Sequence, residues 1–277
     1  MSVANLDAIS AAQEKRMLQT FNAIVSDIKD QAVLNELVRA LENNNVDAVI
    51  ELLGLDDATW EPMSDAIRSA YREGGITGAV QIGNIPTNAG VLVMRFNARA
   101  PRAEQWIQTQ SSQLITEIVS DQRQAVREQL EAGLVAGDNP RTTALNLIGR
   151  IDPTTKKREG GTIGLTNQQA QWSVNARDEL DNLDPSYFNR KLRDKRLDAK
   201  IRKAIDNNEP LSQSTINTAI SRMQQRTLKY RGDVISRTES LNALRSGQFE
   251  AIRQAAERGG VDANDVTKAW NATNDAR

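Results

Sequence analysis

The sequence contains no cysteine and no histidine. Without cysteine the chain forms no disulfide and no thiolate zinc site. Without histidine it lacks the commonest general base, the usual partner of a serine or cysteine nucleophile, and the usual zinc ligand. Carboxylates and lysines remain as catalytic groups, but the two absences favour a protein that is not an enzyme. We predict no catalytic residue, no metal site and no cofactor.

Aromatic residues and long apolar runs are also scarce. Aromatics make up 4% of the chain and hydrophobic residues 39%, so the core must consist mostly of Leu, Ile, Val and Ala, which suits helices. No apolar run approaches the roughly 20 residues that span a bilayer. The first residues show no apolar stretch of a signal peptide. We therefore expect no membrane partner, and a protein made in a cytoplasm or packaged from one.

Charge is nearly balanced over the chain but is unevenly distributed. The formal net charge is -1. Residues 1–100 carry 8 basic and 13 acidic side chains, whereas residues 150–237 carry 18 basic and 11 acidic ones. This asymmetry indicates a basic surface in the second half.

Apolar residues recur at spacings of three and four, which predicts a mainly α fold. The pattern predicts short helices over 1–82, with a stop at Gly74-Gly75, and core positions for Trp60 and Tyr71. It predicts two long helices, one over 101–134 that opens at Pro101 and one over 211–258 in which Gly232 marks a kink or break. Because a helix as long as 101–134 needs partners along its length, we also expect a homo-oligomer or contact with another protein.

Two segments interrupt the helical pattern. Residues 83–100 predict an extended arm or a short strand, with the β element near 88–97. DPTTKKREGGTIG, at 152–164, predicts a linker or a hairpin, after which Thr166 caps a new helix. The expected division is therefore 1–82, 83–100, a long helix and helical hairpin over 101–150, and 151–277. A second short β element is expected near 266–272.

Residues 189–203 are strongly basic, with eight basic and two acidic side chains. Leu192, Leu197 and Ile201 keep one face apolar, which directs the charge outward. This face either contacts nucleic-acid phosphates without reading sequence, or is a solvated face that balances the acidic first half. The candidate DNA-facing residues are Arg190, Lys191, Arg193, Lys195, Arg196, Lys200, Arg202 and Lys203.

Acidic residues provide the remaining candidates for catalysis. Asp178, Glu179, Asp181 and Asp184 cluster near an expected helix end, where exposure is the simpler interpretation. A second pair would be Glu239 with Asp275, but Glu239 lies two positions from Arg237 and points to a different helix face. Neither set identifies a catalytic partner.

The segment ISRTESLNALRSGQFEAIRQA (235–255), followed after a glycine break by KAWNATNDAR (268–277), resembles the phage head morphogenesis family, the Mu F-like minor head proteins. That family's pattern has an Arg-Thr-Glu triplet at a helix start, a helix of small residues, and a tryptophan segment ending in an Asp-Arg pair. The family pattern usually continues past the Asp-Arg pair to a histidine, which this sequence lacks. The matching positions are Arg237, Thr238, Glu239, Ala243, Gly247, Trp270, Asp275 and Arg277.

The resemblance covers most of the chain and implies a head morphogenesis domain over 151–277. It implies a minor head protein of a tailed bacteriophage, made in the host bacterial cytoplasm and located in the virion. Such a protein would bind the portal protein inside the capsid, lie near packaged DNA, and aid head assembly or genome ejection. Two alternatives stay open: a virion-carried carboxylate-based nuclease or toxin-like transferase, and a DNA-binding internal head or ejection protein without portal contact.

The triplet itself is interpreted as a structural clasp. The Arg237 guanidinium can bind carbonyls or a carboxylate, Thr238 can cap a helix, and Glu239 favours a helix N-terminus. Trp270 would cover this site as a buried plate, with Asp275 in the same tail. We expect this clasp to stabilise the protein rather than to carry out chemistry.

Overall fold

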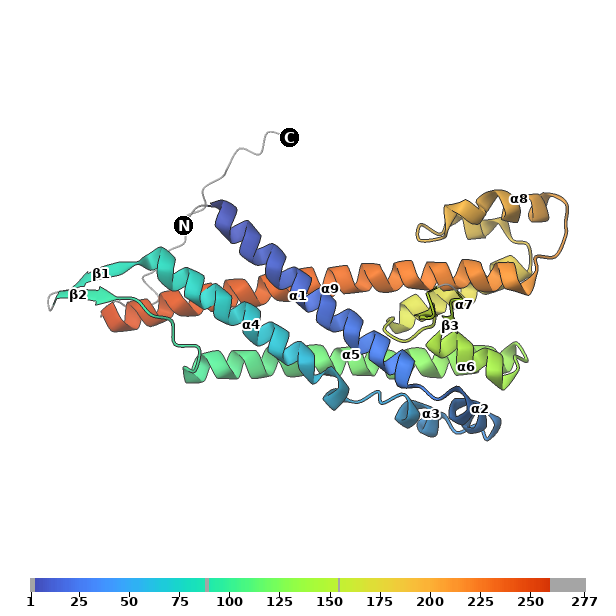
Figure 1. The fold of residues 1–277 in the computed structure, drawn as a ribbon, viewed down its shortest axis with the longest axis horizontal. Helices are drawn as coiled ribbons and strands as arrows, with labels where there is room; N and C mark the ends of the chain where they lie inside the picture. Colours follow the sequence, from blue (N-terminus) through green and yellow to red (C-terminus); the bar gives the residue numbers. More distant parts are fainter. Residues whose placement is uncertain (1–2, 88–89, 154, 260–277) are drawn as a thin grey trace. The chain divides into compact units, whose positions relative to one another are not determined.

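The computed structural model describes residues 3–87, 90–153 and 155–259, and it confirms the mainly α fold (Figure 1). The long helices are α1 (Val3–Gln31), α4 (Asp57–Ile82), α5 (Pro101–Val135) and α9 (Gln213–Gly259). The shorter α-helices are α2 (Leu34–Glu42), α3 (Val46–Leu52), α6 (Pro140–Ile148), α7 (Asn167–Asp181) and α8 (Asp198–Asp206). Two short 3₁₀ helices are η1 (Pro185–Asn189) and η2 (Lys195–Leu197).

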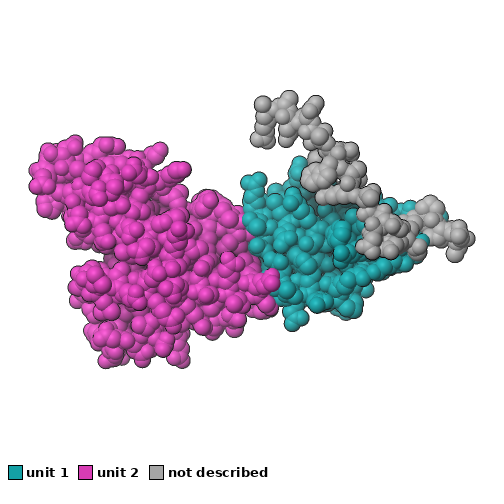
Figure 2. Space-filling view, turned by 180° about the vertical axis from the view of Figure 1, so that it is seen from behind, with its two compact units in different colours: residues 1–17, 64–110, 237–277 teal, residues 18–63, 111–236 magenta. Residues whose placement is uncertain are grey.

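The chain divides into two compact units, which Figure 2 distinguishes by colour. Unit 1 comprises residues 1–17, 64–110 and 237–277, and unit 2 comprises residues 18–63 and 111–236. Each long helix contributes residues to both units. The boundaries expected after residues 82, 100 and 150 stay predictions.

Unit 1 contains a β-hairpin close to the expected strand. Strands β1 (Asn84–Thr87) and β2 (Gly90–Val93) pair antiparallel, so the β element lies somewhat earlier than the 88–97 expected. The element expected near 266–272 lies outside the described residues. A small apolar cluster adjoins the hairpin and is built from Ala79, Met94, Ala251 and Ala255, with Ile82, Leu92 and Phe96 packed against it.

Glycines in unit 1 let two helices approach closely. A Cβ on Gly74 would lie 2.0 Å from the carbonyl oxygen of Leu244, and one on Gly247 would lie 2.0 Å from that of Tyr71. No side chain fits at either position. The helix stop expected at Gly74-Gly75 is therefore wrong: α4 continues to Ile82, because these glycines serve the packing of α4 against α9.

Two further expectations about helix length are wrong. The first 82 residues form two long helices, α1 and α4, rather than short ones throughout. Helix α9 also passes through Gly232 without a break, where an added Cβ would meet the side chains of Leu18 and Phe21. Contacts between distant segments set these lengths, and local glycine and polar signals are overridden.

The expected core is largely confirmed. Trp60 and Tyr71 are buried. The apolar stripe of α1 is buried at Met17, Phe21, Ile24, Val25 and Ile28.

The stripe of α5 is also covered by the chain itself, which weakens the case for a partner. Its buried members are Ile107, Leu114, Ile115, Ile118, Val119, Val126 and Leu130. Leu134 is the exception, at 68% exposure. The length of this helix therefore does not by itself require a second subunit, and the homo-oligomer stays a prediction.

In unit 2 the segment between α6 and α7 forms the expected hairpin. Strands β3 (Arg150–Ile151) and β4 (Arg158–Glu159) pair antiparallel. Thr166 then caps α7 through a capping box with Gln169, as predicted from its position.

Long side chains hold the glycine-rich turn that follows this hairpin. Lys29 Nζ donates to the Gly160 carbonyl at 2.7 Å, and the amide of Gly161 donates to Gln224 Oε1 at 2.8 Å. Arg231 donates to the Gly164 carbonyl and to Asp121, each at 3.0 Å. Burial lowers the pKa of Lys29 to about 8, against a weaker opposing effect of Asp30.

Candidate nucleic-acid interface

The basic segment 189–203 does not form one continuous helix. Asp194 accepts a hydrogen bond from the Arg196 amide and so caps η2, and α8 begins only at Asp198. The predicted apolar side is present nonetheless. Ile201 is buried, and Leu192 and Leu197 pack against a cluster that includes Tyr187. The short polar caps explain why the helix is interrupted.

Asp194 lies at the centre of an arginine cluster within unit 2. Its carboxylate accepts from Arg196 at 2.9 Å, Arg222 at 2.8 Å and Arg226 at 3.0 Å. The Asp194 side chain is 0% exposed, whereas those of the three arginines are 72%, 37% and 40% exposed. The carboxylate is thus covered by guanidinium groups that themselves reach solvent. We call these four residues the Asp194 cluster.

The electrostatics of the Asp194 cluster favour anions. Hydrogen bonds from Arg196, and then from Arg222, hold the pKa of Asp194 well below its usual range, although the covering of the carboxylate opposes this. The carboxylate is therefore ionised across the physiological pH range. Three guanidinium groups face one carboxylate, which leaves an excess of two positive charges at the surface.

Most other predicted basic residues have a partner within the segment or next to it. Arg190 binds both oxygens of Glu179 at 2.6 Å, and Arg193 forms an ion pair with Asp198 at 2.9 Å.

Two more of these residues contact neutral groups, and the remaining ones reach solvent. Lys200 donates to Thr215 Oγ1 at 2.8 Å, and the Arg202 guanidinium lies 4.1 Å from the centre of the Phe188 ring. Lys191, Lys195 and Lys203 are exposed. The structure therefore brings the predicted residues to one region, with the arginines held in place and these lysines at the surface.

Arg222 and Arg226 belong to this site but were not predicted from the sequence. They lie on α9, far along the chain from Asp194, and only the fold brings them to it. Their spacing of four residues, which places both on one face of a helix, was the available signal.

The Arg-Thr-Glu triplet lies in the interior of α9 and not at a helix start. Thr238 is exposed there and cannot cap the helix, which corrects that part of the clasp prediction. Glu239 Oε2 accepts from Gln110 Nε2 at 3.0 Å, which ties α9 to α5 within unit 1. Arg237 is exposed.

The remainder of the clasp stays a prediction, because Trp270 and Asp275 lie outside the described residues. The small residues of the same motif do have a visible role. Ala243 and Gly247 are buried on α9, and Gly247 is one of the glycines at the contact with α4.

The acidic candidates serve the local structure. Glu179 pairs with Arg190, Asp184 caps η1, and Asp181 accepts from Gln213. Burial raises the pKa of Asp178, and Asp181 adds to the effect. Over residues 3–87, 90–153 and 155–259, no group of three or more acidic side chains is arranged to hold a metal ion.

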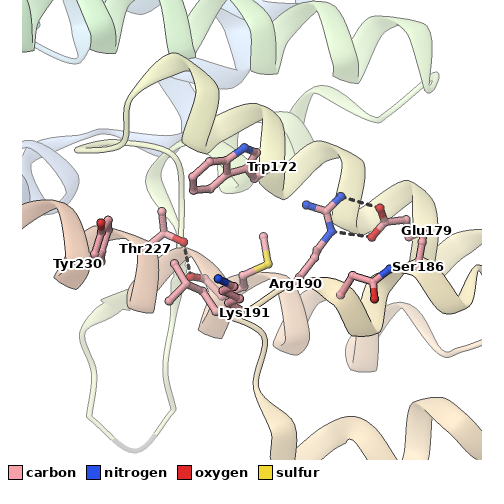
Figure 3. Close-up of a pocket in the computed structure, with 10 residues that line it drawn as sticks. Trp172, Glu179, Ser186, Arg190, Lys191, Thr227 and Tyr230 are labelled. Carbon is pink, nitrogen blue, oxygen red and sulfur yellow. Dashed lines mark hydrogen bonds and ion pairs between the residues drawn. The ribbon is translucent and has the colours of Figure 1, made fainter.

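A cleft of about 640 Å³ opens beside this basic region in unit 2 (Figure 3). Trp172 projects into the cleft from α7 and Tyr230 projects into it from α9. Trp172 is 38% exposed and Tyr230 is 55% exposed. Lys191 and the Arg190–Glu179 pair line the same cleft, together with Met223.

No family model, curated protein or solved structure matches this chain. Among the described helices, none combines the length and apolar character that crossing a bilayer requires.

Proposed function

We propose that this protein is a minor head protein of a tailed bacteriophage, which binds the portal inside the capsid and contacts the packaged DNA through the Asp194 cluster. The resemblance to the Mu F-like family supports the head and portal parts of this proposal. The Asp194 cluster supports the DNA contact, and it is the observation that carries the proposal.

The geometry of the Asp194 cluster suits phosphate. A guanidinium group has five N–H donors, so an arginine that binds Asp194 retains donors for a second acceptor. Arg222 and Arg226 are partly exposed and are already ordered by the buried carboxylate. Less side-chain entropy is then lost when a phosphate binds, which favours binding.

Binding of this kind would not depend on base sequence. Guanidinium contacts to phosphate position a protein on nucleic acid but carry no direct sequence information. Each neutralised phosphate releases condensed counterions, so affinity should fall steeply as salt rises. This behaviour suits a protein that lies against a genome of arbitrary sequence.

The DNA contact can be tested by fluorescence anisotropy with a labelled duplex over a range of salt concentrations. The double variant Arg222→Gln/Arg226→Gln should bind more weakly, and its plot of log affinity against log salt should be shallower by about 2. Arg127→Gln, which removes a surface ion pair with Asp47 in the same unit, is the matched control. An unchanged slope in the double variant would show that the Asp194 cluster does not face DNA.

Portal binding is tested separately by co-purification with the portal protein of the same phage. Retention of the protein on immobilised portal is the expected result. DNA binding without retention would support the alternative of an internal DNA-binding protein. Nicking of plasmid DNA in the presence of magnesium would instead support the carboxylate-based nuclease.

A further inference from the structure

The cleft beside the Asp194 cluster presents two aromatic rings to solvent. Trp60, Tyr71 and Tyr187 are at most 2% exposed, whereas Trp172 is 38% and Tyr230 55% exposed. An exposed tryptophan and an exposed tyrosine that share one cleft are typical of a binding surface. The two rings lie on separate helices, α7 and α9, so their proximity is not visible in the sequence.

Helix α9 links this cleft to the Asp194 cluster. Arg222, Arg226 and Tyr230 are spaced four residues apart, which places them along one side of the helix. Each step of four residues advances about 6 Å along the helix axis. A strand whose phosphates lie on the two arginines therefore continues toward Tyr230 and the cleft.

The charges around the cleft are compatible with an anionic chain. Both oxygens of Glu179 are bound by Arg190, so the carboxylate in the cleft wall is neutralised by its partner. Lys191 adds an exposed cation to the same wall. A phosphate that enters thus meets a net positive lining.

We propose that this cleft binds unpaired bases of single-stranded nucleic acid, which stack on Trp172 and Tyr230 while the adjoining phosphates lie on Arg222, Arg226 and Lys191. Stacking on aromatic rings tolerates any base sequence, because every base has a π face. Bases inside a duplex are already stacked on each other, so they are not available to stack on Trp172 and Tyr230. This inference rests on the proposed DNA contact and adds a preference for exposed single strands.

The size of the cleft fits this occupant. A volume of about 640 Å³ lies in the range of pockets that enclose small organic molecules, and it accommodates one or two bases but not a duplex. The apolar contribution of Met223 and Leu192 suits the flat faces of bases.

The test compares the binding of a labelled single strand of about 12 nucleotides with the binding of a duplex of the same length. A strand of about 12 nucleotides lies within the range that single-strand-binding modules cover. Trp172→Leu/Tyr230→Leu should lower single-strand affinity by about tenfold or more, while duplex affinity changes by less than about twofold. Trp172→Phe/Tyr230→Phe should keep most of the single-strand affinity, because phenylalanine also stacks. Phe249→Leu, at an exposed aromatic residue in unit 1, is the matched control.

An abasic oligonucleotide of the same length isolates the contribution of the bases. Wild-type protein should bind it about tenfold more weakly than the normal strand, which needs no variant and so does not depend on how well a variant folds. Equal binding of the normal and abasic strands would overturn the stacking proposal. The proposed DNA contact would still stand if duplex binding depended on Arg222 and Arg226, and would fail if the wild type bound neither form.

Discussion

A glycine contact between helices in unit 1 and a set of charged contacts in unit 2 illustrate two different ways of stabilising the fold. In unit 1, helices α4 and α9 meet backbone to backbone, because Gly74 and Gly247 leave no room for a side chain. In unit 2, charged side chains reach into turns and loops: Lys29 holds Gly160, Arg231 holds Gly164, and Asp194 is surrounded by arginines.

The difference shows which kind of change each unit tolerates. A backbone contact yields little to an added atom, so unit 1 should be sensitive to side-chain size. A network of hydrogen-bonded charges tolerates small changes in shape, but it is destabilised when a charge or a hydrogen-bond donor is lost. The Lys29, Arg231 and Asp194 contacts of unit 2 should therefore be sensitive to loss of charge, and the Lys29 contact also to pH.

The largest effect is expected at the glycine contact of unit 1. Gly247→Ala should lower the free energy of unfolding by about 3 kcal/mol, because the new Cβ would overlap the Tyr71 carbonyl and outweigh the better helix propensity of alanine. The matched control is Gly232→Ala on the same helix, where the added Cβ meets side-chain atoms rather than backbone: the end of the flexible Leu18 side chain at 2.9 Å and the Phe21 ring at 3.2 Å. That change should stay within about 1 kcal/mol. Equal losses in urea melts of the two variants would contradict the comparison.

A smaller effect is expected from pH through Lys29 in unit 2. Its pKa is about 8 in the folded protein and 10.5 as a free side chain, so between these values the unfolded state binds more protons. Stability should then rise with pH over this window, by about 2.5 kcal/mol between pH 8 and pH 10.5, and Lys29 should add little pH dependence below about pH 7.

The variant Lys29→Met removes the titrating group while keeping a side chain of similar length. Urea melts between about pH 7 and pH 10 should show a rise for the wild type that the variant lacks. Parallel curves for the two proteins would mean that Lys29 titrates normally in the folded state.

The smallest effect separates a true helix cap in unit 2 from the triplet threonine in unit 1. Thr166→Ala should cost about 1 kcal/mol, because the Thr166 side chain accepts from the Gln169 amide at the start of α7. Thr238→Ala should change stability by less than about 0.5 kcal/mol, since this threonine is exposed within α9. A cost of the same size at both positions, measured by thermal melts, would restore the capping role expected for Thr238.

The sequence predicts those features of the fold that depend on neighbouring residues. The apolar spacing around Phe21 predicts a buried helix face, and Thr166 predicts a helix start. The Gly74-Gly75 pair led to the wrong prediction of a helix end, because glycine is equally suited to a helix end and to a close contact between helices. Only the distant partner, Leu244, decides between the two.

The candidate site was predictable only in part, for a similar reason. The high positive charge of residues 189–203 is visible in the composition. That Asp194 gathers Arg222 and Arg226 is not, since the pairing depends on how α9 packs near the segment. The cleft likewise needs Trp172 and Tyr230 from separate helices.

The order of the units along the chain has a consequence for synthesis on the ribosome. All residues of unit 2 lie between 18 and 236, whereas in unit 1 residues 237–259 of α9 pack against residues 64–110. Gly247 reaches its partner Tyr71 only after the whole of unit 2 has been translated. During elongation unit 2 can therefore fold first, and the surface of α4 around Gly74 stays uncovered until residues 237–259 of α9 have been translated.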